Sequence, residues 1–322
     1  MSVLVYTENW DGKFKKLTGE LVSYAAGVAA MTGGEVVALS IGNVSQDELS
    51  NLGKFGAGRV LNVENAPQGL DNQLYTQIIA SAVEATGAKI LVMAHNNTGK
   101  GVAPRLSVRL KAGLASGVTG LPVSADPLVV PKKVFSGKAF GKVEILTPLA
   151  VLTLSQNSFE ISETGGTAAI EAFDPGVDLS TGKTAIKNVQ KQEGKLLLTD
   201  AEVVVSGGRG MKSPDNWGPI EELAQVLGAA TACSRPVSDE GWRPHEEHTG
   251  QTGKIIAPNL YMAFGISGAI QHLAGVSSSK CIVAVNTDKD APIFEAADYG
   301  IVGDAMKVLP RLIEEIRAAR SR

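Results

Sequence analysis

Strand-like and helix-like patterns of apolar residues alternate along the first part of the chain. Ser2–Tyr6 is a short apolar run typical of a strand, and residues 17–31 have helical spacing that stops at Gly33 and Gly34. The same alternation predicts strands at 35–41, 59–63 and 89–94 and helices at 45–58, 71–86 and 99–114. These strands are apolar throughout rather than alternately apolar and polar. They therefore predict a parallel sheet covered by helices on both faces.

The pattern changes after residue 115. Short β-prone runs follow at 118–125, 128–135, 142–146 and 150–154, broken by glycine and proline, with no convincing helix between them. They predict an antiparallel or mixed extension at the edge of the first sheet. The segment 178–195 is polar and rich in lysine, as linkers are, so we place a domain boundary near Thr199.

A second alternation of strands and helices begins at residue 202. Its strands are predicted at 202–205, 229–233, 261–264, 281–285 and 299–302, with helices at 217–227, 269–273 and 305–320 and an irregular loop at 236–253. The chain is therefore predicted to be an α/β protein of two tandem domains, each a mostly parallel sheet flanked by helices. The N-terminal domain, 1–199, includes the β extension and the linker, and the C-terminal domain comprises 200–322.

The composition argues against several classes of function. A chain of 322 residues is long enough for two domains, and a net charge of −3 without basic clusters argues against binding to nucleic acid or an anionic membrane. No signal peptide is recognisable and no apolar run approaches the roughly 20 residues of a membrane span, so a soluble, cytoplasmic protein is expected. Cys233 and Cys281 lack metal-binding or disulfide-framework spacing and are expected to be small buried hydrophobes.

Residues suited to holding phosphate stand at the predicted carboxyl ends of the second domain's strands, where open parallel sheets bind their ligands. These residues are Gly207–Arg209, Ser234–Arg235, Gly265–Gly268 and Asn286. Glycine lets backbone N–H groups approach an anion, Ser267 is placed to cap a helix that faces a diphosphate, and the two arginines supply counter-charge. The stretch is neither a GxGxxG motif nor a Walker A loop. A tight turn with a solvated arginine would explain Ser206–Gly210 equally well on its own.

Other chemistries find little support in the sequence. His245 and His248 lie beside Glu246 and Glu247, but they lack helical HxxxH spacing and a third ligand, so no metal site is predicted. There is no GxSxG elbow, and a lone helical histidine such as His272 is more often a surface or core residue than a functional one. The residues thus predict binding of a nucleotide cofactor without an evident catalytic acid, base or nucleophile.

The run LYMAFGISGAIQHLAG at 260–275, followed by IVAVN at 282–286, closely resembles the signature of the electron transfer flavoprotein α subunit family. The flanking segments agree with it, namely SGGRG at 206–210, SRPVSDEGW at 234–242, GQTGK at 250–254 and DAPIFEAADYGIVGD at 290–304. The resemblance is specific over 202–322 and looser over the first domain, where the order of elements matches. It implies a non-catalytic, nucleotide-hydrolase-like N-terminal domain and a Rossmann-like FAD-binding C-terminal domain.

The resemblance also implies one FAD, held mostly by the second domain, with a β subunit completing the cleft. Thr252 would contact the flavin N5 edge, while His272 and Arg235 would lie near N1 and the C2 carbonyl, stabilise the anionic semiquinone and raise the potential. The helix near Ser267 would receive the diphosphate, and Asn286 and Asp304 would hold the adenosine. One departure is Thr249, where the family often has an apolar residue. By similarity the FAD contacts are Arg209, Ser234, Arg235, Thr249, Gly250, Gln251, Thr252, Ser267, Gly268, Ala269, Ile270, Gln271, His272, Asn286, Asp304 and Ala305.

Members of this family carry electrons from soluble dehydrogenases, such as acyl-CoA dehydrogenases in fatty-acid β-oxidation, to a membrane-bound flavoprotein–quinone oxidoreductase. The resemblance therefore implies a non-enzymatic carrier in an αβ heterodimer, located in the cytoplasm, or in the mitochondrial matrix if the source is eukaryotic. Three alternatives remain open at this point. They are a bifurcating or low-potential carrier serving a reductase or nitrogen fixation, an NAD-dependent enzyme on a related fold, and a nucleotide-binding interaction module, for which only the first domain argues.

Overall fold

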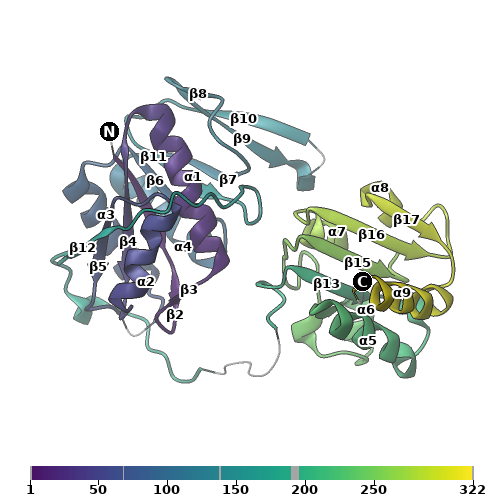
Figure 1. The fold of residues 1–322 in the computed structure, drawn as a ribbon. Helices are drawn as coiled ribbons and strands as arrows, with labels where there is room; N and C mark the ends of the chain where they lie inside the picture. The colour runs from purple at the N-terminus through teal and green to yellow at the C-terminus, as the bar shows by residue number, and fades with distance from the viewer. Residues whose placement is uncertain (1, 68, 138, 190–195, 321–322) are drawn as a thin grey trace. The chain divides into compact units, whose positions relative to one another are not determined.

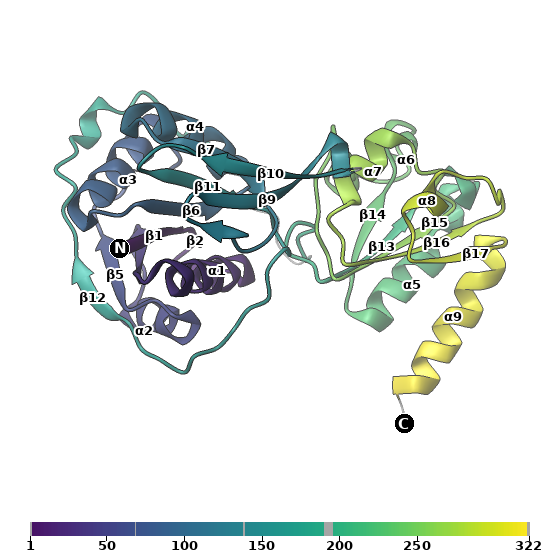
Figure 2. The same ribbon diagram turned by 90° about the horizontal axis from the view of Figure 1, so that it is seen from above.

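The computed structural model describes residues 2–67, 69–137, 139–189 and 196–320. The chain forms two compact units, Met1–Gln190 and Lys191–Arg322, drawn in purple to teal and in green to yellow in Figures 1 and 2. Leu198, which precedes the boundary predicted near Thr199, is already buried in the core of the C-terminal unit. Among the described residues, no helix has both the length and the apolar character needed to cross a membrane.

The N-terminal unit is built on one mixed sheet. Its strands run in the order β10-β9-β7-β11-β6-β1-β4-β5-β12, with β8 paired to β9, and every pairing from β7 to β12 along this order is parallel. The strands are β1 Ser2–Thr7, β4 Glu35–Ile41, β5 Arg59–Val63, β6 Ile90–Ala94, β7 Gly113–Val118, β8 Ser124–Ala125, β9 Leu128–Val134, β10 Ala139–Ile145, β11 Ala150–Leu154 and β12 Ala169–Ala172, and a separate hairpin comprises β2 Asn9–Trp10 and β3 Lys13–Phe14.

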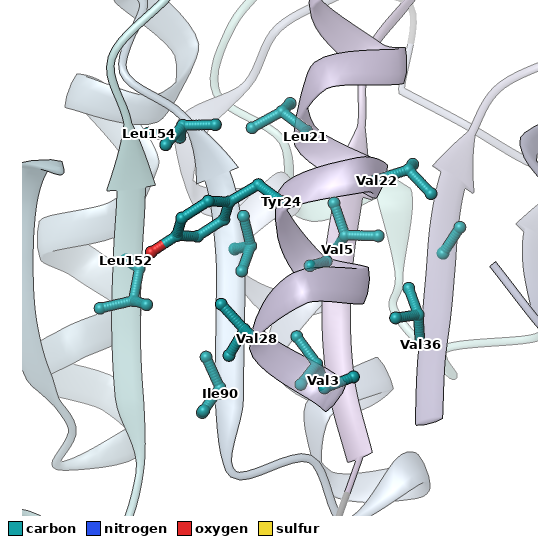
Figure 3. Close-up of a cluster of buried hydrophobic side chains, with 14 of the residues drawn as sticks. Val3, Val5, Leu21, Val22, Tyr24, Val28, Val36, Ile90, Leu152 and Leu154 are labelled. Carbon is teal, nitrogen blue, oxygen red and sulfur yellow. The ribbon is translucent and has the colours of Figure 1, made fainter. Parts of the chain in front are cut away.

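Helices cover both faces of this sheet, as the apolar strands predict. The helical elements are α1 Lys16–Thr32, α2 Gln46–Ser50, η1 Asn51–Phe55, α3 Asn72–Thr86, α4 Asn97–Leu110, η2 Phe135–Gly137 and η3 Leu179–Thr181. On one face α1 packs Leu21, Tyr24 and Val28 against strand residues such as Val5 and Leu152 (Figure 3). On the other face α3 and α4 form a second apolar cluster with the same strands. The sheet therefore separates two cores.

The edge region of this unit differs from the prediction. The helix predicted at 99–114 ends at Leu110, and residues 113–118 form β7. The run 150–154 was expected in an edge extension, but as β11 it lies inside the sheet, parallel to β6 and β7, because its residues are apolar on both faces and all buried. The antiparallel part is limited to β8, β9 and β10. Strand β12 was not predicted, since it has only four residues, most of them exposed, and it is held to β5 partly by the Arg59–Glu171 ion pair.

The C-terminal unit is a five-stranded, all-parallel sheet. The strands run in the order β14-β13-β15-β16-β17, and helices α5 and α9 pack on one face while α7 and α8 pack on the other. Its elements are β13 Val203–Gly207, η4 Arg209–Met211, η5 Pro214–Trp217, α5 Gly218–Leu227, β14 Ala230–Cys233, α6 Arg235–Asp239, η6 His245–Glu247, β15 Leu260–Phe264, α7 Ile270–Val276, β16 Cys281–Asn286, α8 Ile293–Ala296, β17 Tyr299–Val302 and α9 Ala305–Arg320.

The predicted strands and long helices of this unit are confirmed, with two additions. The loop expected at 236–253 contains the short helices α6 and η6, and α8 was not predicted because it has only one turn. Cys233 is buried as expected, whereas Cys281 is only half-buried, and both are free thiols.

Candidate functional site

The order of the strands locates a switch point in the C-terminal sheet. From β13 the chain moves to β14 on one side and then returns to β15 on the other side. Ligands of open parallel sheets bind beyond the carboxyl ends of the two strands that flank such a point. Those ends carry Gly207 and Gly208 after β13 and Gly265 after β15. Predicted phosphate-binding residues thus lie where the topology expects a ligand.

The two glycine turns at this point pack backbone against backbone. The Gly208 amide donates to the Phe264 carbonyl at 2.9 Å, and the Gly210 amide donates to the Gly265 carbonyl at 3.0 Å. A Cβ on Gly208 would lie 2.2 Å from the Gly265 oxygen, and Gly265 has a φ of 63°. Side chains are therefore excluded here by both contact and backbone conformation. The result is a cradle of main-chain atoms at the switch point.

Arg209 and Arg235 stand beside this cradle, each with a carboxylate from the α6 segment. Arg209 lies 3.8 Å from Glu240, and Arg235 lies 3.2 Å from Asp239. The two arginine side chains are 66% and 64% exposed. Exposed ion pairs of this kind contribute little, so either guanidinium can turn to an anionic ligand at low cost. The predicted role of counter-charge fits this arrangement.

The predicted contact loop, residues 249–252, is fixed between β14 and α7. The amide of buried Thr249 donates to the Cys233 carbonyl at 3.0 Å, and the Gln251 amide donates to the Gln271 carbonyl at 2.7 Å. Gly250 packs against α7 so closely that a Cβ on Gly275 would lie 2.4 Å from the Gly250 Cα. The side chains of Gln251 and Thr252 remain exposed. The loop thus has a fixed backbone and outward side chains.

A buried ion pair that sequence reasoning missed anchors the base of this loop. Arg243 donates to both carboxylate oxygens of Glu247 at 2.8 Å and to Glu221 at 2.7 Å. The side chains of Arg243 and Glu247 are only 16% and 6% exposed. In the sequence the pair is indicated only by the spacing of four residues between Arg243 and Glu247. Oppositely charged residues at this spacing are also common on solvent-exposed helices. Only burial makes the pair structurally important.

The start of α7 differs from the prediction that Ser267 caps it. The helix begins at Ile270, after Ala269, and no side chain caps it. Gly268 has a φ of 84°, which is not helical, so the turn delays the helix by two residues. Ser267 is exposed, and its carbonyl accepts a hydrogen bond from the Ile293 amide at 3.0 Å. Residues 267–271 therefore lie together at the open end of α7, although not with the predicted cap.

His272 is among the least accessible of the polar residues predicted to contact FAD, together with Ser234 and Thr249. It is 7% exposed, and its Nε2 lies 2.8 Å from the hydroxyl of Tyr261. Burial lowers the pKa of His272 to about 4, so the imidazole is neutral at pH 7. This position is compatible with a hydrogen-bonded core residue, and it is also compatible with the predicted role of His272 in the flavin site.

Asn286 and Asp304 follow β16 and β17 at the same edge. The Asn286 amide group donates to the Ile266 carbonyl at 2.9 Å, which ties β16 to the glycine turn after β15. Asp304 accepts from the Met306 amide at 3.0 Å and lies 3.3 Å from Lys212. These two hydrogen bonds, the first being the stronger influence, hold the pKa of Asp304 below its ordinary value. Ala305, the first residue of α9, is buried behind it.

The predicted site residues thus follow the carboxyl ends of all five strands in one unit. Ser234, 7% exposed, completes the set through its amide, which donates to the Gly207 carbonyl at 3.1 Å. A hollow of about 300 Å³ lies elsewhere, at the amino end of β14 near Leu198 and Arg243, and no predicted FAD residue lines it. Over the described residues, no group of three or more histidine, cysteine or acidic side chains could hold a metal.

The N-terminal unit has its own switch point, between β1 and β6, but a side chain fills it. The Glu8 carboxylate accepts from Asn96 Nδ2 at 3.0 and 3.1 Å, and Asn96 Oδ1 caps α4 by accepting from the Gly99 amide. Burial raises the pKa of Glu8, while the hydrogen bonds from Asn96 and Thr98 lower it. A negative group of the chain itself therefore sits where a phosphate would bind. This arrangement favours the C-terminal unit as the ligand-binding one.

A parallel sheet with glycine turns at its switch point and arginines beside them defines a protein that binds a nucleotide-containing cofactor. Comparison with known families specifies it further. A family model described as "Electron transfer flavoprotein domain" matches residues 3–178, and one described as "Electron transfer flavoprotein FAD-binding domain" matches 197–277. The chain belongs to the electron transfer flavoprotein family, and the unit that carries the site is its FAD-binding domain.

Relatives of nearly full length agree with this assignment. The chain is 39% identical to the electron transfer flavoprotein subunit alpha of Bacillus subtilis over 98% of its own length and 97% of the relative's. It is 38% identical to the protein of the same name from Syntrophomonas wolfei, over 97% and 98%. It is also 39% identical to protein FixB of Escherichia coli, over 80% and 84%. The α subunit resemblance seen in residues 260–286 is therefore confirmed over the whole chain.

Proposed function

We propose that this chain is the α subunit of an electron carrier that holds one FAD. It accepts electrons from soluble dehydrogenases, such as acyl-CoA dehydrogenases, and passes them to a membrane flavoprotein–quinone oxidoreductase. The observation that supports this most strongly is the main-chain cradle formed by Gly208, Gly210 and Gly265 at the switch point of the FAD-binding domain. When bound there, FAD supplies the redox chemistry, and the chain supplies orientation and charge.

The residues around the cradle fit the parts of FAD. The glycine turns and the first amides of α7 suit the diphosphate, because amides at a helix start have no carbonyl partner in the helix. Asn286 and Asp304 suit the adenosine. Arg235 and the loop 249–252 suit the flavin ring. The fit rests on the chemistry of these donors and on the close main-chain packing of the glycine turns.

The carrier role is favoured over catalysis by the character of the polar groups. Arg209 and Arg235 are held in exposed ion pairs, His272 is neutral and buried, and Asp304 is a helix cap with a lowered pKa. Neither His272 nor Asp304 combines exposure with a pKa near 7, as a general acid or base would. The site is suited to tuning a cofactor rather than to transferring protons.

Within this proposal the chain pairs with a β subunit, and the heterodimer works in the cytoplasm, or in the mitochondrial matrix of a eukaryote. The designation "subunit alpha" of the relatives supports a partner subunit. An alternative is a bifurcating or low-potential carrier that serves a reductase or nitrogen fixation, and the FixB relative fits it. That alternative requires a second flavin, on the β subunit.

The test is to co-express the chain with a β subunit from the same organism and to determine the bound cofactor. We expect a yellow heterodimer with one FAD, which is reduced by an acyl-CoA dehydrogenase together with its substrate. A colourless complex that binds NAD instead of FAD would refute the proposal. Two flavins per heterodimer, with reduction by NADH, would support the bifurcating alternative.

A further inference from the structure

A tyrosine that the sequence did not single out lies against His272 in the C-terminal unit. Tyr261, in the centre of the sheet on β15, is fully buried, and its hydroxyl lies 2.8 Å from His272 Nε2 on α7. The ring centroids are 6.0 Å apart, with an angle of 45° between the ring planes. The contact is thus a hydrogen bond between a side chain on a strand and a side chain on a helix, rather than ring stacking.

The direction of this hydrogen bond can be inferred from the surrounding groups. Burial raises the pKa of the Tyr261 phenol, so the phenol keeps its proton. Thr249 Oγ1 donates its own proton to the Cys233 carbonyl at 3.3 Å, and Ser206 Oγ makes no hydrogen bond within the described residues. His272 Nε2 is therefore the acceptor within reach of the buried phenol O–H, which donates to it.

A neutral imidazole carries one proton, so an accepting Nε2 places that proton on Nδ1. His272 is neutral because burial lowers its pKa to about 4. Its Nδ1 is buried and makes no hydrogen bond of normal geometry to any of the described residues, although the Thr249 backbone lies near enough to the ring to raise its pKa. A buried N–H without a full partner is rare in folded proteins. Nδ1 can therefore donate to a ligand beside Thr249, the first residue of the predicted contact loop 249–252.

We propose that Tyr261 is a positioning residue of the FAD site, which holds His272 as the neutral Nδ1–H tautomer and makes it a hydrogen-bond donor to the bound cofactor. The inference rests on the proposed function and sharpens it. His272 then stabilises added negative charge as an oriented neutral donor rather than as a cation. Arg235 remains the positive group, and it is exposed and paired only with Asp239.

The matched experiment compares Tyr261→Phe with Tyr24→Phe in the heterodimer. Tyr24 is also fully buried, in the N-terminal unit, and its hydroxyl has no partner among the described residues. Histidine labelled with ¹⁵N gives resonances for the four histidines of this chain in addition to those of the β subunit, and His272→Gln assigns the relevant one. The tautomer is read from the ¹⁵N shifts, and the flavin midpoint potential from a redox titration.

In the wild-type protein we expect the His272 proton on Nδ1. Tyr261→Phe is expected to move the population toward Nε2–H and to shift the flavin potential to more negative values, with FAD still bound. Tyr24→Phe is expected to change neither. A wild-type proton on Nε2, a doubly protonated ring at pH 7, or an unchanged tautomer and potential in Tyr261→Phe would overturn the proposal.

The same measurement separates this inference from the proposed function. The tautomer can be recorded in flavin-free protein, where the hydrogen bond to Tyr261 is already present. A wild-type protein that binds no FAD yet shows the Nδ1–H tautomer would refute the function and leave the hydrogen-bond assignment intact. A flavin-loaded protein with the other tautomer would refute only the role of Tyr261.

Discussion

Two arginine side chains beside the glycine turns of the C-terminal unit each form an exposed ion pair. Arg209 and Arg235 were predicted as counter-charges, and the structure adds Glu240 and Asp239 from the same short segment. These acids are 44% and 59% exposed, so they moderate the positive charge without burying it. The site therefore carries a positive charge that is weakly held and available to a ligand.

Arg235→Ala tests this at the flavin ring. Loss of the cation should destabilise the reduced, negatively charged flavin by about 1 kcal/mol, or on the order of 40 mV for a one-electron couple, with FAD still bound. A redox titration measures the shift. Arg317→Ala is the control, because Arg317 on α9 is a comparably exposed arginine paired with Glu222 on α5. Equal potentials in the two variants would remove Arg235 from the flavin site.

At the scale of elements, the sequence predicted the strands that are apolar on both faces and the long periodic helices. The prediction failed for segments whose position in the sheet depends on which strand they pair with. The run at 150–154 is an interior strand parallel to β6 and β7, both distant from it in sequence, and the run at 113–118 lies between β11 and the antiparallel strand β9. Strand β12 is too short and too exposed to recognise alone, and α6 and α8 are single turns.

The candidate site shows the same division between local and long-range information. The glycines at 265 and 268 were recognisable because the turn itself demands them. The hydrogen bond between Tyr261 and His272 and the buried Arg243–Glu247 pair were not, since each depends on burial that a linear pattern does not encode. Roles assigned by family resemblance remain predictions about the cofactor.

Gly275→Ala tests the contact between α7 and the loop 249–252. The new Cβ would lie 2.4 Å from the Gly250 Cα, so the loop must move, at a cost of about 1–3 kcal/mol. We expect weaker FAD retention, measured by flavin fluorescence on dilution. Gly218→Ala is the matched control, because it is also helical and nothing lies within 4 Å of its Cβ position. That variant should be neutral or stabilised by up to about 1 kcal/mol. Equal loss of FAD in both would refute the steric argument.

At the scale of the whole molecule, two units with separate cores are joined by a polar segment. The composition of 178–195 predicted a linker, but the sequence could not show how far the chain remains attached to the N-terminal unit. Asp71, which caps α3 through Oδ1, also accepts at Oδ2 from the amides of Lys183 and Thr184 at 3.2 Å. The chain is therefore anchored to the N-terminal unit as far as residue 184.

Asp71→Asn separates these two roles of one carboxylate. Asparagine keeps an oxygen that can cap α3 but puts an N–H₂ group where Lys183 and Thr184 need an acceptor. We expect a loss of about 1–3 kcal/mol in stability and faster tryptic cleavage after Lys183 and Lys187, identified by mass spectrometry. Asp178→Asn is the control, since the exposed Asp178 carboxylate is hydrogen-bonded locally, by the amide and side chain of Ser180.

The anchor should also depend on pH in a defined direction. The Leu74 amide above all, with further help from Thr184, Gln73 and Lys183, lowers the pKa of Asp71 in the folded chain. A lowered folded pKa gives stability that is fully present above the unfolded value of about 3.9 and is lost as the pH falls through the folded value. The difference in unfolding free energy between wild type and Asp71→Asn should therefore be constant from pH 6 to 8 and shrink only below about pH 4. A difference that is already lost at pH 6 would show that another group holds the segment.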